Sequence, residues 1–217
     1  MAPKSLSLSR ATAADIPEIA ALQYRCFPPR IRELFMGCRT EADLPRLAEQ
    51  YARLAAAAPS RYVWTKVAVP SGDKDGACKG REKIIAASNW KVVGGGSGVD
   101  SLGDDEAPGW LDGDAREEAA RMLREMNEAR RRANPGGFVH LHICFTDPDY
   151  RRLGAGGMMM QWGCDLADRL GLPAWVEASP QGSALYRRYG FYDFEPAKGG
   201  LAGTNMKRDA RHGGKEG

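Results

Sequence analysis

The sequence predicts an α/β fold in which helices pack around a mixed sheet. Two observations carry this prediction. Strand-like and helix-like segments follow one another in the order β-α-α-β-β-α-β-α-β-α-β. The most strand-like run, Phe138–Thr146, leads through a turn and a glycine cluster into an amphipathic helix. With 217 residues, 43% of them hydrophobic and 27% charged, the chain has the size and composition of one globular domain.

The first half of the chain combines short strands with Ala- and Leu-rich helices. Leu6 and Leu8 alternate with serines, which indicates a strand, and Thr12 precedes a helix that Pro28 and Pro29 end. A second helix stops before Pro59, and two β-rich runs then form a hairpin. The expected segments are a strand over 5–10, a helix after Thr12, a helix over 41–57, and strands over 61–69 and 83–93.

The second half begins with a glycine-rich, acidic loop over 94–113. The helix after it places Ala119, Met122, Met126 and Ala129 on one face. The remaining expected segments are this helix over 115–132, the strand over 138–146, a helix over 154–170, a strand over 173–178, a helix over 181–189 and a final strand that begins at 191–194. We expect one domain over 1–208 and a flexible tail over 209–217.

Composition excludes several classes of protein. A net charge of +3, with acidic and basic residues mixed, is too small for a nucleic-acid-binding surface. There is no apolar run long enough for a membrane span and no signal-like start, and the five cysteines form no CxxC pair. These features favour a reduced, cytoplasmic protein. A metal site would have to begin from His140 and His142 alone, so no metal is expected.

The segment 140–157 carries the chemistry. A buried strand runs into a turn, then two arginines, then a glycine cluster, then a helix. Glycines let backbone amides approach a ligand, and a helix N-terminus presents free N–H groups to anions. No Gly-Lys-Ser/Thr follows, and Met159 stands where a dinucleotide-binding fingerprint needs a glycine. Taken alone, the loop is equally compatible with a plain helix-starting turn.

Three elements in order resemble the GNAT superfamily of acetyltransferases. Residues 151–156, Arg-Arg-Leu-Gly-Ala-Gly, are similar to its Gln/Arg-x-x-Gly-x-Gly/Ala signature. The segment 145–150 is similar to its strand end, and 185–191, Leu-Tyr-Arg-Arg-Tyr-Gly-Phe, is similar to its Leu-Tyr-x-Lys-x-Gly-Phe segment. The resemblance covers 138–194 and implies a GNAT fold, with a mixed, mostly antiparallel twisted sheet flanked by helices.

The resemblance also implies acetyl-CoA as cosubstrate. It places the pantetheine arm against Phe145 and Thr146, along the splayed end of their strand. It places the pyrophosphate in the loop formed by Arg151, Arg152, Leu153, Gly154, Ala155, Gly156 and Gly157. Ser179 stands where the family often has an asparagine, so this sequence departs from the family pattern at that position.

Acetyl transfer to an amine requires a base for the ammonium and an acid for the departing thiolate. Tyr186 matches the family tyrosine that faces the cofactor sulfur and is the candidate acid, with Tyr189 as the nearby alternative. His140 and His142 are the candidate bases, because residues two apart on a strand share a face and histidine titrates near neutral pH. Their His-Leu-His run resembles arylalkylamine N-acetyltransferases, and His140 also falls where histone-acetylating relatives place a glutamate. Two satisfied core histidines and a core tyrosine remain the alternative.

Strand alternation predicts that Cys144 shares the face of His140 and His142, opposite Leu141, Ile143 and Phe145. A covalent acetyl-cysteine is conceivable, although a buried inert thiol is the simpler interpretation. Glu177, on the next strand, either lines the site or has a purely structural role.

The expected function is acetyl transfer to a primary amine of a small-molecule substrate, by a monomer or homodimer. The alternatives are a protein or peptide N-acetyltransferase and a catalytically silent CoA-binding module. Apolar residues of 27–40 form either an acceptor pocket or ordinary core. The acidic run 100–114 either attracts a cationic amine or is a solvated loop.

Overall fold

The computed structural model describes residues 5–70, 82–95, 107–197 and 202–211. The strands are β1 (Ser7–Arg10), β2 (Tyr62–Pro70), β3 (Glu82–Gly94), β4 (Gly137–Thr146), β5 (Ala174–Ala178), β6 (Tyr192–Pro196) and β7 (Thr204–Arg208). The helices are α1 (Ile16–Cys26), α2 (Pro29–Met36), α3 (Leu44–Ala57), α4 (Gly113–Ala133), α5 (Ala155–Leu170) and α6 (Ser183–Arg188).

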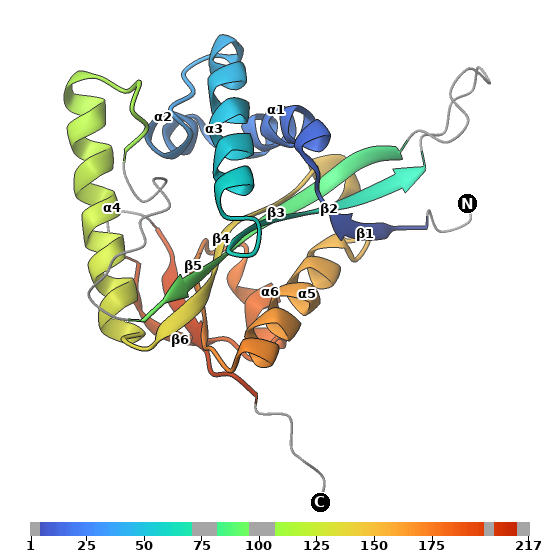
Figure 1. Cartoon of the computed structure of the whole chain (residues 1–217), viewed down its shortest axis with the longest axis vertical. Coiled ribbons are helices and arrows are strands. Elements are labelled where there is room, and N and C mark those ends of the chain that lie inside the picture. The colour runs from blue at the N-terminus through green and yellow to red at the C-terminus, as the bar shows by residue number, and fades with distance from the viewer. Residues whose placement is uncertain (1–4, 71–81, 96–106, 198–201, 212–217) are drawn as a thin grey trace, which may run out of the picture.

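The strands of the described residues form one seven-stranded mixed sheet in the order β1-β2-β3-β4-β5-β7-β6. Neighbouring strands run antiparallel except for the central pair, β4 and β5, which is parallel. Helices α1 to α4 lie on one side of the sheet, and α5 and α6 lie on the other (Figure 1). The predicted α/β fold with a mostly antiparallel mixed sheet is confirmed.

Each face of the sheet has its own apolar core. On one face, α1 and α3 bury Ile19, Leu22 and Leu54 against Trp64 of β2 and other strand residues. On the opposite face, α5 buries Met160, Cys164 and Ala167 against a second cluster that includes Trp90. The sheet is therefore covered on both sides, as expected for an α/β protein.

Two elements were missed at the sequence level. Pro28 and Pro29 do follow the end of α1, but Pro29 also starts α2, because proline is well suited to the first turn of a helix. Gly37 then ends α2 with φ of 64°. Strand β7 was missed because its sequence, TNMKR, is mostly polar. It is nevertheless largely buried, since Arg208 is paired with Asp168 of α5 at 2.7 Å.

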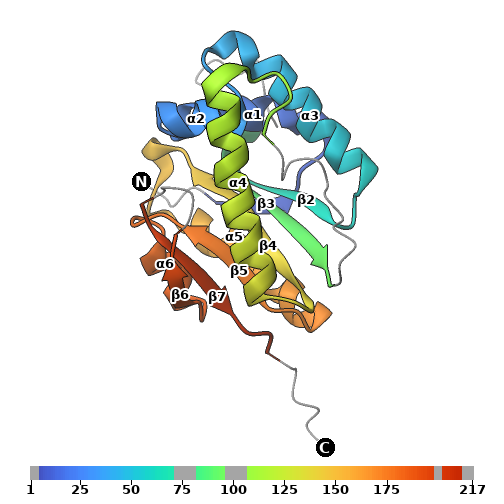
Figure 2. The same ribbon diagram turned by 90° about the vertical axis from the view of Figure 1, so that its left-hand side faces the viewer.

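Helix α4 is the longest of the described helices and lies over the strands β3 to β5 in Figure 2. Its C-terminal residue Ala133 packs with Phe138 of β4 and Trp175 of β5. Its N-terminal part packs on α2, through a cluster that includes Leu34, Ala119 and Met122. Helix α4 thus covers the face of the sheet that carries the two candidate histidines.

Candidate active site

The loop between β4 and α5 has the backbone that an anion-binding turn requires. Arg152 and Gly154 have positive φ angles of 63° and 102°, which turn the chain sharply before α5 begins at Ala155. No side chain caps the N-terminus of α5, so amides of its first turn keep their hydrogen-bonding capacity for a ligand. Only glycine adopts the Gly154 geometry without strain.

The side chains of this loop leave its outer surface open. Arg151, Arg152, Leu153 and Gly154 are all exposed, and the side chain of Leu153 protrudes with 52% of its surface accessible. Arg151 reaches back to the carbonyl oxygen of Thr146 at 3.4 Å. The two arginines therefore stand beside the uncapped helix end, where their charge adds to the helix dipole.

Gly156 and Gly157 serve close packing as well as the loop. A Cβ atom on Gly156 would lie 3.0 Å from Leu185, and one on Gly157 would lie 2.9 Å from the hydroxyl of Tyr189. Both neighbours belong to the segment around α6. The glycines thus bring α6 against the first turn of α5, which joins two of the sequence elements singled out above.

Strands β4 and β5 separate soon after they meet. Their register contains only the pairs Val139 with Ala174 and His140 with Trp175. From Leu141 to Thr146, β4 has no partner in β5, so its backbone on that edge is left for another extended chain. The ring of Phe145 points into the core and contacts Phe27 edge-to-face at 6.0 Å, which leaves the backbone as the part of Phe145 available at this edge.

A β-bulge at His142 changes the predicted pattern of faces. Asn89 pairs with Ile143 and Trp90 pairs with Leu141, so His142 has no opposite residue in β3. The rings of His140 and His142 lie 5.5 Å apart at 62°, which confirms that they are neighbours. The expected place of Cys144 was wrong. Cys144 packs with Leu141 in the core under α5, while Ile143 and Phe145 pack under α1 and α3. The extra residue of a bulge breaks the two-residue alternation of a strand.

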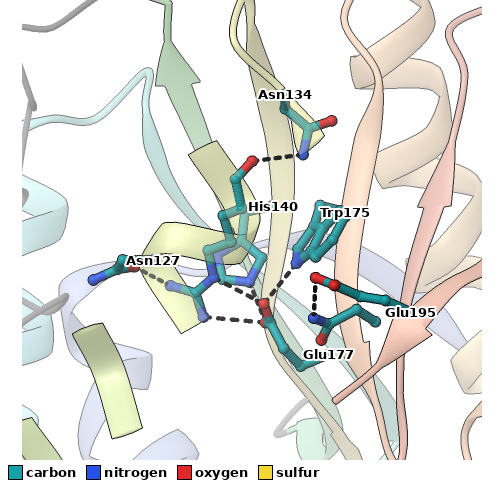
Figure 3. Close-up of polar contacts among 8 residues, drawn as sticks. Asn127, Asn134, His140, Trp175, Glu177 and Glu195 are labelled. Atoms are coloured by element: carbon teal, nitrogen blue, oxygen red, sulfur yellow. Dashed lines mark hydrogen bonds and ion pairs between the residues drawn. The ribbon is translucent and has the colours of Figure 1, made fainter. Parts of the chain in front are cut away.

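His140 belongs to a buried polar network that joins α4, β4 and β5 (Figure 3). Its Nε2 lies 2.9 Å from Oε2 of Glu177. Arg130 of α4 donates to both oxygens of the same carboxylate, from Nε at 2.8 Å and from Nη2 at 3.1 Å. The indole nitrogen of Trp175 donates to Oε1 at 2.6 Å. Glu177 is therefore the hub of the network.

Burial and charge set the protonation of this network. Burial opposes ionisation of Glu177, but the positive charge of Arg130 and the hydrogen bonds outweigh it and hold its pKa well below the usual range. Burial lowers the pKa of His140, Arg130 and Lys91 lower it further, and Glu177 opposes them only in part. The network therefore contains a carboxylate and a neutral imidazole near pH 7.

Tyr186 and Cys144 lie on the other face, in the core under α5 and α6. Burial raises the pKa of Tyr186, and the neighbouring Cys144 raises it further. Tyr186 is 8% exposed, and its hydroxyl has no hydrogen-bond partner among the residues that the structure describes. Burial also raises the pKa of Cys144 to about 12. Cys144 is thus a protonated thiol and a poor nucleophile.

Other sequence predictions have mixed outcomes. In the region 27–40, Leu34 and Met36 belong to the core, whereas Phe27, Ile31 and Phe35 are half-buried. Ser179 is engaged locally, because its Oγ accepts from the amide of Gly182 at 3.2 Å. Residues 100–106 of the acidic run and 212–217 of the expected tail lie outside the described residues.

Arg130 was missed at the sequence level. It lies four positions after Met126, on the apolar face of α4, and a charge at such a position requires a buried partner. A charged residue on the apolar face of this predicted helix was therefore the feature of the sequence that could have identified Arg130. Within the described ranges, no three His, Cys, Asp or Glu side chains gather as metal ligands would, and no helix has the length and apolarity of a membrane span.

Sequence comparison finds a matching family model and a relative. The family model "Acetyltransferase (GNAT) family" matches residues 81–191. An uncharacterized N-acetyltransferase of Schizosaccharomyces pombe is 34% identical over 58 residues, which are 27% of this chain and 25% of the relative. The chain therefore spans about a quarter of the length of that curated relative.

Solved structures share the fold at low sequence identity. The structure titled histone acetyltransferase HPA2 and related acetyltransferase, from Corynebacterium glutamicum, is 14% identical, with a TM-score of 0.58 over 97% of this chain and 99% of that one. The structure titled predicted acetyltransferase with acetyl-CoA, from Clostridium acetobutylicum, is 14% identical, with a TM-score of 0.50 over 88% and 92% of the two chains. The family model, which covers half of the chain and includes both β4 and the glycine loop, shows that this protein belongs to the acetyltransferase (GNAT) family.

Proposed function

We propose that the protein transfers the acetyl group of acetyl-CoA to a primary amine of a small molecule. The observation that carries this proposal is the uncapped N-terminus of α5, with its glycine turn and two exposed arginines, beside the unpaired end of β4. An anion-binding loop next to a free strand edge suits a cosubstrate that has a pyrophosphate and an extended amide-containing arm.

The residues present fit acetyl-CoA. Arg151, Arg152 and the backbone from Leu153 to Gly157 would hold the pyrophosphate, and the β4 backbone at Phe145 and Thr146 would hold the pantetheine arm. When bound, acetyl-CoA supplies an activated thioester carbonyl. Gly154 supports this assignment, because a Cβ at that position would meet nothing within 4 Å, so the space above the turn is open.

Two side chains on opposite faces of the sheet suit the two proton movements. His142 is half-buried, whereas His140 is only 1% exposed, so His142 is the better placed of the pair to meet an incoming amine. His142 then accepts the proton that the ammonium loses. Tyr186 keeps its proton at neutral pH and can give it to the leaving sulfur. The amine nitrogen bonds to the carbonyl carbon as the carbon–sulfur bond breaks.

The packing of α2 favours a small acceptor over a protein. A polypeptide acceptor needs an open groove near residues 27–40. In this structure α2 packs on α4, and the indole nitrogen of Trp110 donates to the carbonyl of Gly37 at 2.8 Å. One solved structure with the same fold, Naa20 of Chaetomium thermophilum, was obtained with a bisubstrate analogue, and a peptide acceptor remains an outcome of the test below.

We also propose that residues 1–208 form a single acetyltransferase domain. Arg208, at the end of β7, pairs with both carboxylate oxygens of Asp168 in α5, each at 2.7 Å. The amide of Arg211 donates to the same carboxylate at 2.7 Å. These contacts support a domain boundary shortly after β7. Expression of residues 1–211 tests the boundary, and loss of soluble, folded protein would contradict it.

A thiol-release assay tests the function. Purified protein is mixed with acetyl-CoA and a panel of arylalkylamines, polyamines and peptides, and free CoA is measured with a thiol reagent. We expect release that depends on a small primary amine and an acetylated product of the corresponding mass. Turnover of peptides alone would favour a protein acetyltransferase. Binding of CoA without turnover of any acceptor would favour a silent binding module.

Substitutions then test the histidine assignment. Replacement of both His140 and His142 by alanine should remove the acidic limb of the rate profile, because that limb reports protonation of the base. His212→Ala, the third histidine of the sequence, is the matched control and should leave the profile unchanged. An unchanged profile in the double variant would exclude both histidines as the base.

A further inference from the structure

Arg130 and Glu177 belong to the network around His140, but the proposed acetyl transfer gives neither of them a role. Arg130 is 4% exposed and grips the carboxylate of Glu177 with two of its nitrogens. Its third nitrogen, Nη1, donates to Asn127 at 2.7 Å. A charge pair buried this deeply has a large desolvation cost, so a role beyond packing deserves a direct test.

The hydrogen bonds determine which nitrogen of His140 carries the proton. Glu177 is ionised and can only accept hydrogen bonds. The contact between its Oε2 and Nε2 of His140, at 2.9 Å, therefore requires a hydrogen on Nε2. In a neutral ring, Nδ1 then bears the lone pair. Trp175 donates to the other carboxylate oxygen, so Glu177 is held from three sides (Figure 3).

The charges around His140 come from every strand or helix that packs against it. Lys91 is its register partner on β3, Arg130 faces it from α4, Glu177 from β5, and His142 is its neighbour on β4. Arg130 and Glu177 form an ion pair, and the charge of Lys91 on β3 also disfavours a proton on His140. A second positive charge on His140 is disfavoured in this setting, whereas His142 is half-buried and nearer to solvent.

We propose that Glu177, anchored by Arg130, is a positioning residue that holds His140 as its Nε2–H tautomer, while burial and the charge of Arg130 keep the ring neutral, so that the proton lost by the acceptor amine is taken up on His142. This inference rests on the proposed acetyl transfer. Neutral His140 gives His142 a fixed ring to pack on and adds no positive charge beside it. A protonated His140 with its ring centre 5.5 Å away would make a proton on His142 less favourable.

The wild-type protein tests the first half of the proposal without turnover. Nitrogen-15 NMR of the histidine rings distinguishes the two tautomers and the protonated form. We expect His140 to show the Nε2–H tautomer and to remain neutral from pH 8 down to about pH 5.5. A protonated His140 at pH 7, or an Nδ1–H tautomer, would overturn the proposal.

The pH–rate profile tests the second half. The NMR titration midpoint of His142 should coincide with the acidic limb of kcat/KM, while His140 shows no transition there. If the acidic limb of kcat/KM coincided with a titration of His140 instead, the assignment of His142 as the base would be refuted. The same amine must be used for all variants, so that its own titration contributes equally to every profile.

Two single variants should change the electrostatic environment of the histidine pair and thereby the acidic limb of the pH–rate profile or the protonation of His140. Glu177→Gln removes the negative charge beside His140 and Arg130, so the acidic limb should move to lower pH by about one unit and kcat should fall about tenfold. Arg130→Met leaves Glu177 unpaired, so His140 should gain a proton within the range pH 6–8. The two substitutions change the protonation of His140 in opposite directions, because Glu177 favours a proton on this ring and Arg130 disfavours it. A loss of packing alone does not produce opposite changes.

The double variant separates charge from packing. Arg130→Met with Glu177→Gln removes both charges, so the limb should return to within a few tenths of a unit of the wild-type position, although stability falls. Arg121→Met is the matched control, because Arg121 is an exposed arginine of the same helix. Equal shifts in the double and single variants would refute the electrostatic role. If no acceptor is turned over, the proposed function is wrong. The tautomer of His140 in the wild-type protein, measured by NMR, still decides whether Glu177 positions this ring.

Discussion

The contact between Gly163 and Trp90 sets how closely α5 approaches the sheet. Gly163 lies in the middle of α5, and a Cβ atom built on it would fall 2.0 to 2.2 Å from three atoms of the Trp90 ring. Trp90 is completely buried and is held by a hydrogen bond from its indole nitrogen to Ser88 at 3.0 Å. Because α5 also starts at the glycine loop, a shift of α5 would displace the candidate cofactor site. We therefore predict that Gly163→Ala destabilises the protein.

The magnitude follows from two opposing effects. Alanine in a helix is favoured over glycine by about 1 kcal/mol. Overpacking of a close-packed core costs about 1–3 kcal/mol, and the depth of this overlap with a pinned ring places the cost at the upper end. The net change in the free energy of unfolding is a loss of about 1–2 kcal/mol. For a domain of this size, that loss lowers Tm by about 3–6 °C.

Thermal unfolding followed by circular dichroism measures this prediction. Trp90→Phe in the Gly163→Ala background is the matched variant, since a smaller ring relieves the overlap and should restore part of the lost Tm. A rise of Tm in Gly163→Ala would refute the reasoning, because helix propensity would then outweigh the contact. Failure of the double variant to recover any stability would show that Trp90 is not the obstacle.

The remaining predictions concern the site. Arg151→Ala should raise KM for acetyl-CoA about tenfold with little change in kcat, since one charge-assisted contact is lost; an unchanged KM in steady-state assays would contradict a phosphate contact. Tyr186→Phe should lower kcat by about 10- to 100-fold without lowering Tm, because a proton donor is lost but the ring remains; Tyr192→Phe, at an exposed tyrosine of β6, is the control. Acid should destabilise the protein through His140. Its pKa in the folded protein is lowered from 6.5, so the unfolded chain binds the extra proton, and the stabilisation present above pH 6.5 is lost as the pH falls. Urea unfolding between pH 7 and 5 should show a slope of up to about 1.4 kcal/mol per pH unit, and His140→Gln should flatten it.

The parts of the fold that local sequence determines were predictable. The Phe138–Thr146 strand, the turn at Gly154 and the helix after it depend on residues that are neighbours in the chain. Glycine at a position with φ of 102° and a helix that begins without a side-chain cap are local properties. The glycine loop and the family resemblance could therefore be recognised from the sequence alone, and the family match over 81–191 confirms the resemblance.

The tertiary structure decided what depends on distant residues. The bulge at His142 arises from the register between β4 and β3, so strand alternation placed Cys144 on the wrong face. The partner of His140 lies on β5, and the arginine that anchors that partner comes from α4, 47 positions from Glu177. A buried charge pattern indicates that some partner exists, but only the packing of α4 over the sheet selects Glu177. The sequence by itself determined the glycine loop proposed to bind the cofactor and the histidine pair, and the three-dimensional packing determined how the buried charges hold one of those histidines.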